Sequence, residues 1–347
     1  MNAISVQGTI DRWSALSGVR FLLASIVVFV HMGERISIGS LNFIADFGGF
    51  EAVLGFLLVS GYSVTSSYLK QPEGFLRRRL QRLYPVYLVS IALTWLVVVL
   101  IEKAPAPSWG LLLANVLFLN QIVTSFSFVL PAWSLSLEFW LYCLAPFLIG
   151  LKPRWSRIAL YGSFACYLAY TACRSLLHFP YHAGMGYGVN LFLLAFLWIA
   201  GLRLAKEPDR ARECVRDIGL IFAGHIAFIS AIQFVYRLKH NNLAAFFRED
   251  TLPFVQQALT LGFVFWVFTK WVIGGKGRPL KRSPLLQFLG DISYPLYLVH
   301  IPAIVFLKSR QITNPWAVFA ATLMLATMVF FLADFYTQKR HPLPIRA

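Results

Sequence analysis

The sequence predicts an all-α, polytopic membrane protein, and three observations support this fold class. Hydrophobic residues make up 58% of the 347 residues and aromatic residues 16%, and the mean hydropathy is +0.65, which is high for a soluble protein. Apolar runs of about 20 residues, the length that crosses the hydrocarbon core, recur along the chain. Basic residues gather in the short connections between these runs. We therefore expect one transmembrane domain covering residues 1–347.

The apolar runs and their flanks predict about ten transmembrane helices. One further apolar segment, Trp109 to Gln121, is too short to cross the membrane and ends in two amides, so we expect a short re-entrant or interfacial helix there. The ten predicted spans are residues 14–33, 50–69, 83–101, 131–150, 158–177, 187–204, 217–236, 253–273, 285–307 and 315–336.

The distribution of basic residues predicts the orientation. With the N-terminus in the cytoplasm, 22 of the 31 Lys and Arg residues fall on the inner side and 8 on the outer side, as the positive-inside rule requires. We expect a multi-pass protein of the inner (plasma) membrane with both termini cytoplasmic. The net charge of +16 then reflects topology and contact with the bilayer, and no nucleic-acid partner is expected. The four cysteines include no CxxC pair, so we expect no metal site.

The first span carries two ionisable residues, Arg20 and His31. Eleven residues of α-helix turn through about 1100°, so both side chains point the same way, about 16 Å apart along the axis, with the small Ala24 between them. Ionisable groups inside a membrane helix usually face a bundle interior or a watery cavity and indicate function. The alternative is that Arg20 extends to one headgroup layer while His31 marks the opposite interface.

Basic residues also cluster at the inner end of the third span, in the sequence FLRRRLQRLYPVY. Arg79 and Arg82 are three residues apart on a predicted helix start, so their guanidinium groups are neighbours, and Arg78 lies beside them. Paired guanidinium groups suit phosphate oxygens. The alternative is a juxtamembrane cluster that only fixes orientation or binds anionic lipid.

Two later spans carry further polar residues. Glu138 lies about 10 Å below the predicted outer surface, one turn from Ser134, where a carboxylate indicates either a functional group or a structural partner of an arginine. The ninth span carries Tyr297 and His300. The roles of Asp291 and Asp334 stay open, and His225 in the seventh span is interpreted as a histidine whose hydrogen bonds are satisfied inside the bundle.

Taken together, these residues resemble the integral membrane acyltransferase 3 family. The resemblance consists of the Arg20 to His31 spacing and four later stretches in the family's order: GFLLVSGY, RRRLQRLYPVY with its RxxR motif at Arg79 and Arg82, WSLSLEFWLY, and ISYPLYLVHIP. These stretches cover essentially the whole chain. The C-terminal ADFYTQKRHP departs from the family pattern, which leaves the role of Asp334 in doubt.

The resemblance implies an O-acyltransferase that moves an acyl group, usually acetyl, from cytoplasmic acyl-CoA to a hydroxyl of an extracytoplasmic glycan, lipid-linked sugar or similar acceptor. Acyl-CoA is then a co-substrate, and no permanently bound cofactor is expected. Arg78, Arg79, Arg82 and Arg20 would bind the phosphates of the donor.

The same resemblance suggests roles for the remaining candidate residues. His31 would act as the general base, with Glu138 orienting the imidazole, and an acyl-histidine intermediate is the competing mechanism. Ser134, Tyr297 and His300 are candidates for binding the acceptor or the oxyanion. A transporter or channel for a small anionic substrate is the alternative function, because intramembrane charges and kinked helices also suit transport pathways.

Overall fold

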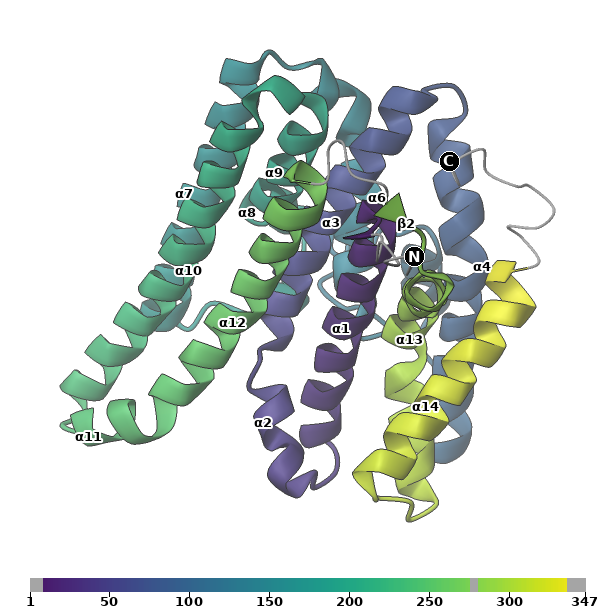
Figure 1. Cartoon of the computed structure of the whole chain (residues 1–347). Helices are drawn as coiled ribbons and strands as arrows, with labels where there is room; N and C mark the ends of the chain where they lie inside the picture. Colours follow the sequence, from purple (N-terminus) through teal and green to yellow (C-terminus); the bar gives the residue numbers. More distant parts are fainter. Residues whose placement is uncertain (1–8, 275–279, 336–347) are drawn as a thin grey trace, which may run out of the picture.

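The computed structural model describes residues 9–274 and 280–335 and is built almost entirely from helices (Figure 1). Several helices end in short 3-10 or π segments, such as Val97–Ile101 after α4, Phe268–Ile273 after α12 and Phe330–Phe335 after α14. The helices are α1 (Arg12–Gly33), α2 (Asn42–Ala45), α3 (Gly49–Lys70), α4 (Phe75–Leu96), α5 (Trp109–Val116), α6 (Ala132–Gly150), α7 (Pro153–Leu177), α8 (Val189–Leu193), α9 (Ala195–Lys206), α10 (Ala211–Lys239), α11 (Leu243–Ala245), α12 (Thr251–Val267), α13 (Pro284–Ser309) and α14 (Pro315–Val329).

The predicted all-α membrane fold is confirmed. Eight helical segments of the described residues are long and apolar enough to cross a membrane. The other two predicted spans, 158–177 and 187–204, correspond to α7 and to the α8–α9 pair, which is interrupted after Leu193. Because neither is among the eight, the number ten stays a prediction. The side chain of Asp334, and the basic residues Lys276, Arg278, Lys339, Arg340 and Arg346, lie outside the described residues.

Two short strands depart from the purely helical pattern. β1 (Thr9–Ile10) pairs in parallel with β2 (Leu280–Lys281), just before α1 and α13. Asp11 then caps α1 by accepting hydrogen bonds from the backbone N–H groups of Trp13 and Ser14. These contacts hold the starts of α1 and α13 together, so the two helices run side by side in the same direction.

The short segment between α4 and α6 enters the bundle, as its length predicts. Phe118 follows α5, is fully buried, and stacks between Tyr87 of α4 and Phe139 of α6 at 4.7 Å from each ring. The Phe118 carbonyl accepts a hydrogen bond from Trp140 Nε1 at 2.8 Å. Its backbone polar groups therefore find partners on the neighbouring helices, which a non-helical segment needs inside a membrane protein.

Small residues let the central helices approach closely. A Cβ added to Gly61 of α3 would lie 2.0 Å from the Trp198 carbonyl oxygen of α9, and one added to Gly201 would lie 2.2 Å from the Leu58 carbonyl oxygen. Likewise, a Cβ added to Gly290 of α13 would lie 2.4 Å from the Ser17 side chain of α1. Backbone-to-backbone packing of this kind is typical of membrane helices, and it sets how the polar faces of α1, α3 and α13 meet.

Candidate active site

A cavity of about 110 Å³ lies between α1, α3, α4, α6 and α13. We call it the arginine cavity, because three guanidinium groups line it. Six of the nine residues singled out in the sequence come together here, although they come from four different helices. They are Arg20, Arg79, Arg82, Ser134, Glu138 and Tyr297.

Two of the three guanidinium groups of this cavity contact neutral neighbours. Arg20 Nη2 donates to Ser63 Oγ at 2.9 Å, and Arg79 lies 5.6 Å from the ring centre of Phe75 and 5.9 Å from that of Tyr142. Within the described part of the chain, no carboxylate oxygen lies within 4.0 Å of a nitrogen of Arg20, Arg79 or Arg82. The cavity is therefore suited to an anion that supplies the missing oxygens.

Glu138 is the carboxylate of the arginine cavity, and its partner is a phenol. Tyr142, one turn further along α6, donates from its hydroxyl to Glu138 Oε1 at 2.7 Å. The sequence-based hypothesis places Glu138 behind the imidazole of His31, but no hydrogen bond joins the two among the described residues. The structure instead places the Glu138 carboxylate beside the guanidinium groups.

Arg78 is the one predicted donor-binding residue that the structure places outside the cavity. Its guanidinium group donates to the backbone carbonyls of Glu73 and Gln71 in the turn between α3 and α4. Gly74 in this turn has φ +62°, and Arg78 follows one turn into α4. In this structure Arg78 closes the turn that positions Arg79 and Arg82.

His31 pairs with His300 rather than with a carboxylate. His31 Nδ1 lies 2.8 Å from His300 Nε2, and the two rings stack at 5.0 Å. His300 Nδ1 lies 3.2 Å from the Leu296 carbonyl oxygen, which only accepts, so this nitrogen carries the proton in the neutral ring. His300 Nε2 then accepts from His31 Nδ1–H. His31 Nε2 is left with a lone pair, which is what a general base needs.

His31 lines a second cavity of about 560 Å³, near the helix ends that the basic loops predict to be extracytoplasmic. We call it the outer cavity. Its walls come from α1, α3, α6, α7, α10, α12, α13 and the connection before α8, with aromatic, acidic, basic and amide side chains side by side. A volume of this size is within the range of about 300–1,000 Å³ typical of small-molecule sites.

The two cavities adjoin at Tyr297 and Val53, which line both of them. The Tyr297 hydroxyl lies 2.7 Å from Ser134 Oγ and donates to the Pro131 carbonyl at 3.2 Å. Ala24, expected to leave room between Arg20 and His31, is fully buried and lines neither cavity. The boundary between the cavities is thus formed by α3 and α13, not by α1 alone.

Sequence reasoning missed Glu51 and Tyr167 of the outer cavity, and it interpreted His225 as a histidine with satisfied hydrogen bonds inside the bundle. His225 Nε2 lies 3.2 Å from Glu51 Oε1, and its Nδ1 lies 2.9 Å from the Tyr167 hydroxyl. All three side chains line the outer cavity, and Glu51 is only 5% exposed. The available signal was Glu51 itself, an acidic residue inside the apolar run GFEAVLGFLL.

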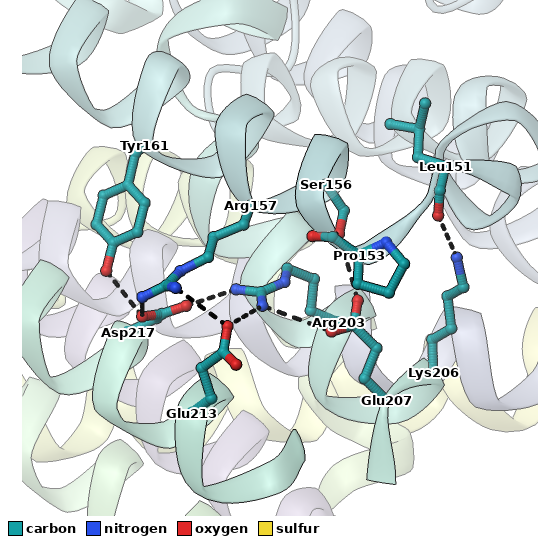
Figure 2. Close-up of polar contacts among 10 residues, drawn as sticks. All are labelled: Leu151, Pro153, Ser156, Arg157, Tyr161, Arg203, Lys206, Glu207, Glu213 and Asp217. Atoms are coloured by element: carbon teal, nitrogen blue, oxygen red, sulfur yellow. Dashed lines mark hydrogen bonds and ion pairs between the residues drawn. The ribbon is translucent and has the colours of Figure 1, made fainter. Parts of the chain in front are cut away.

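The charged residues between the start of α7, the end of α9 and the start of α10 form a different arrangement (Figure 2). Asp217 of α10 accepts from Arg203 of α9, from Arg157 Nη2 at 3.0 Å and from the Tyr161 hydroxyl at 2.8 Å. Arg203 Nη2 also meets Glu213 at 3.1 Å. We call this set the paired cluster. Its charges are matched by partners, which suits a structural connection between helices.

Comparison with known proteins identifies the family. Residues 13–334 match the family of acyltransferase domains. The chain belongs to this acyltransferase family. The match covers nearly the whole chain, so the resemblance seen in the sequence is confirmed.

Individual relatives are distant. O-acetyltransferase OatA of Staphylococcus aureus (strain NCTC 8325 / PS 47) is 26% identical over 304 residues, covering 76% of this chain and 47% of the relative. ORF330 of Acidianus two-tailed virus, named as a candidate acetyltransferase, is 23% identical over 261 residues, covering 71% of this chain and 68% of the relative. The chain spans about half the length of the staphylococcal relatives it matches. No solved structure matches the chain.

Proposed function

We propose that this acyltransferase is a membrane O-acetyltransferase that moves an acetyl group from cytoplasmic acyl-CoA to a hydroxyl of an extracytoplasmic glycan or glycolipid. One observation supports this most strongly: a cavity rich in guanidinium groups adjoins a second cavity that contains a histidine with a free lone pair. The names of the relatives support acetyl as the group transferred. The protein lies in the inner membrane with both termini cytoplasmic, as its basic loops predict.

The donor binds from the cytoplasmic side. Arg79 and Arg82 lie in the first half of α4, close to the α3–α4 turn, and face the arginine cavity with Arg20. Phosphate oxygens of CoA accept charge-assisted hydrogen bonds from these guanidinium groups. The thioester end then reaches past Tyr297 and Val53 towards His31, which requires a shift of the Tyr297 side chain from its hydrogen bonds to Ser134 and Pro131.

Transfer follows from the histidine pair. His31 Nε2 takes the proton of the acceptor hydroxyl while the hydroxyl oxygen attacks the thioester carbonyl carbon. The carbon–sulfur bond then breaks, the new ester keeps the acetyl group, and the departing CoA thiolate takes the proton from the His31 imidazolium. His300 holds the ring of His31 in the required orientation through the 2.8 Å contact. Ser134 and Tyr297, at the boundary of the cavities, are positioned to donate to the carbonyl oxygen as its negative charge develops.

A covalent route uses the same residue. His31 Nε2 attacks the thioester carbon itself, and CoA leaves as the thiolate. The acceptor hydroxyl then displaces the imidazole from the acetyl group, and its proton passes to the freed His31 Nε2 and from there to solvent. Ping-pong kinetics, with CoA released before the acceptor binds, would identify this route. Sequential kinetics, in which both substrates bind before either product leaves, would identify direct transfer.

The test is CoA release from acetyl-CoA by the purified protein, with and without methyl pyranosides as acceptors. We expect His31→Ala to lower transfer by at least about 1,000-fold, because removal of a general base together with the nucleophilic nitrogen leaves only binding effects. His178→Ala is the matched control, since His178 is exposed at the end of α7 and lines neither cavity. A transporter would leave the thioester intact in every variant, and that result would overturn the proposal.

A further inference from the structure

The proposed reaction leaves one group of buried polar side chains in the outer cavity without a role. It consists of Glu51 at the start of α3, His225 in α10 and Tyr167 in α7. His225 is 1% exposed. Three helices therefore converge on a polar contact in the same cavity that contains His31.

The directions of the hydrogen bonds in this group follow from the chemistry of Glu51 and Tyr167, the residues on either side of His225. With the Glu51 carboxylate as acceptor, His225 Nε2 carries the proton that it donates over 3.2 Å. His225 Nδ1 then has a lone pair and accepts from the Tyr167 hydroxyl at 2.9 Å. Both ring nitrogens of His225 are therefore occupied, one by Glu51 and the other by Tyr167. The second carboxylate oxygen, Glu51 Oε2, has no hydrogen-bond donor among the residues that the structure describes.

The backbone at Gly48 packs against that free oxygen and limits where it can lie. A Cβ added to Gly48 would lie 2.0 Å from Glu51 Oε2 and 2.9 Å from Gln257 Cγ, and Gly48 has φ +87°. The carboxylate thus rests against a backbone position that only glycine fills without strain. Gln257 lines the same cavity, and its buried Oε1 also has no hydrogen-bond donor in the described part of the chain. The Glu51 Oε2 oxygen and the amide group of Gln257, both of residues that line the cavity, are the polar groups left for a ligand.

The same cavity offers aromatic surfaces. Phe50 stacks on His182 at 5.0 Å with an interplanar angle of 10°, and Tyr181 meets Phe50 edge-on at 6.1 Å. Trp133 and Phe254 add further rings to the lining. A free carboxylate oxygen and an amide next to flat apolar surfaces suit a ligand with hydroxyl groups on its edge and apolar C–H faces, which is the chemistry of a pyranose ring.

We infer that Glu51, held by His225 and supported by Gln257, binds a hydroxyl pair of a pyranose acceptor and so presents a neighbouring hydroxyl to His31. Glu51 and Gln257 are binding residues for the acceptor, and His225 is a positioning residue that acts through Glu51. This inference rests on the proposed function, because it assigns the outer cavity to the acceptor of that reaction.

The alternative is that Glu51 only stabilises the fold, by its place in the first turn of α3 and its pairing with His225. The two explanations predict different kinetics. A structural carboxylate affects every acceptor alike, whereas an acceptor-binding carboxylate affects only acceptors that have extra hydroxyls. A site built to hydrogen-bond a ligand hydroxyl binds an analogue without that hydroxyl much more weakly, because the polar groups of the site are then left without partners.

The experiment compares acetyl transfer to methyl glucoside, methyl galactoside and methyl N-acetylglucosaminide with transfer to 1-propanol, which offers one hydroxyl. We expect the best pyranoside to be preferred over 1-propanol by at least about tenfold in kcat/KM. Glu51→Gln keeps an oxygen for His225 but removes the charge. It should lower kcat/KM for the pyranoside by about 30-fold, mainly through KM, and that for 1-propanol by about threefold or less. Gln257→Leu should give the same pattern with a smaller loss, of about fivefold.

Asp250→Asn is the matched control, because Asp250 is a carboxylate beside α12 that pairs with Arg237 and does not line the outer cavity. It should preserve the preference for the pyranoside. Equal losses for both acceptors in Glu51→Gln, or a wild-type enzyme with no preference for any pyranoside, would overturn this inference alone. Absence of CoA release with every acceptor, water included, would overturn the proposed function and with it this assignment.

Discussion

The arginine cavity and the paired cluster contain the same kinds of charged residue in opposite arrangements. In the paired cluster, fully buried Arg203 meets Asp217, Glu213 and Glu207, so its charge is neutralised inside the protein (Figure 2). In the arginine cavity, Arg20 donates to a hydroxyl and Arg79 lies beside two aromatic rings. Paired charges connect helices, whereas guanidinium groups without carboxylate partners are arranged for an anion that arrives from outside.

The largest effect on stability should come from the paired cluster. Asp217→Ala removes the acceptor shared by Arg203, Arg157 and Tyr161 and leaves Arg203 short of a partner. Breaking a buried pair in this way costs about 3–5 kcal/mol. Thermal unfolding in detergent should show a large drop in Tm, while the KM for acetyl-CoA of the remaining folded protein stays close to that of the wild type. An unchanged Tm would contradict the structural role of the cluster.

Removing an arginine from the cavity should have the opposite signature. Arg79→Ala and Arg82→Ala each remove charge-assisted hydrogen bonds to the donor, so KM for acetyl-CoA should rise about 10–100-fold. Tm should stay the same or increase, because a like-charge neighbour is removed. Arg154→Ala is the control, since Arg154 is exposed near the start of α7 and lies outside the arginine cavity. A fall in Tm without a change in KM would place these arginines with the paired cluster.

Glu138→Gln tests the one carboxylate of the arginine cavity. The amide keeps an oxygen for the Tyr142 hydroxyl but loses the negative charge beside the guanidinium groups. We expect kcat to fall by about tenfold, because product CoA is held more tightly when the positive charge of the cavity is no longer offset. Single-turnover kinetics should show the chemical step nearly unchanged. A large loss in that step would instead support contact between Glu138 and the His31 imidazole during the reaction.

A smaller effect should appear at His182, which lies outside the membrane-spanning segments. Burial lowers the pKa of His182 to about 4, although the Asn190 side chain, 3.2 Å away, opposes this. Between pH 6.5 and 4 the unfolded chain therefore takes up a proton that the folded protein does not, so stability falls as the pH falls. His182→Gln should flatten the dependence of Tm on pH in this range, whereas His178→Gln should not.

The sequence indicated most of the side chains of the candidate site but not their partners. The spacing of Arg20 and His31 within one helix and the RxxR pattern of Arg79 and Arg82 indicated which residues face the interior. The structure then joined His31 to His300, and Glu138 to Tyr142. Glu51 and His225 are 174 positions apart. No spacing within one helix reveals a contact of that kind.

The sequence by itself determined the all-α membrane fold, and it predicts a short re-entrant or interfacial helix before α6 and, through its basic loops, the orientation. The reason is that hydrophobic length and helical periodicity are local properties, fixed by the bilayer and by the backbone. Only the tertiary structure decided that Tyr297 and Val53 separate two cavities and that Glu51 faces the same cavity as His31. Those contacts depend on how closely helices approach, which Gly61, Gly201 and Gly290 set by packing against neighbouring helices.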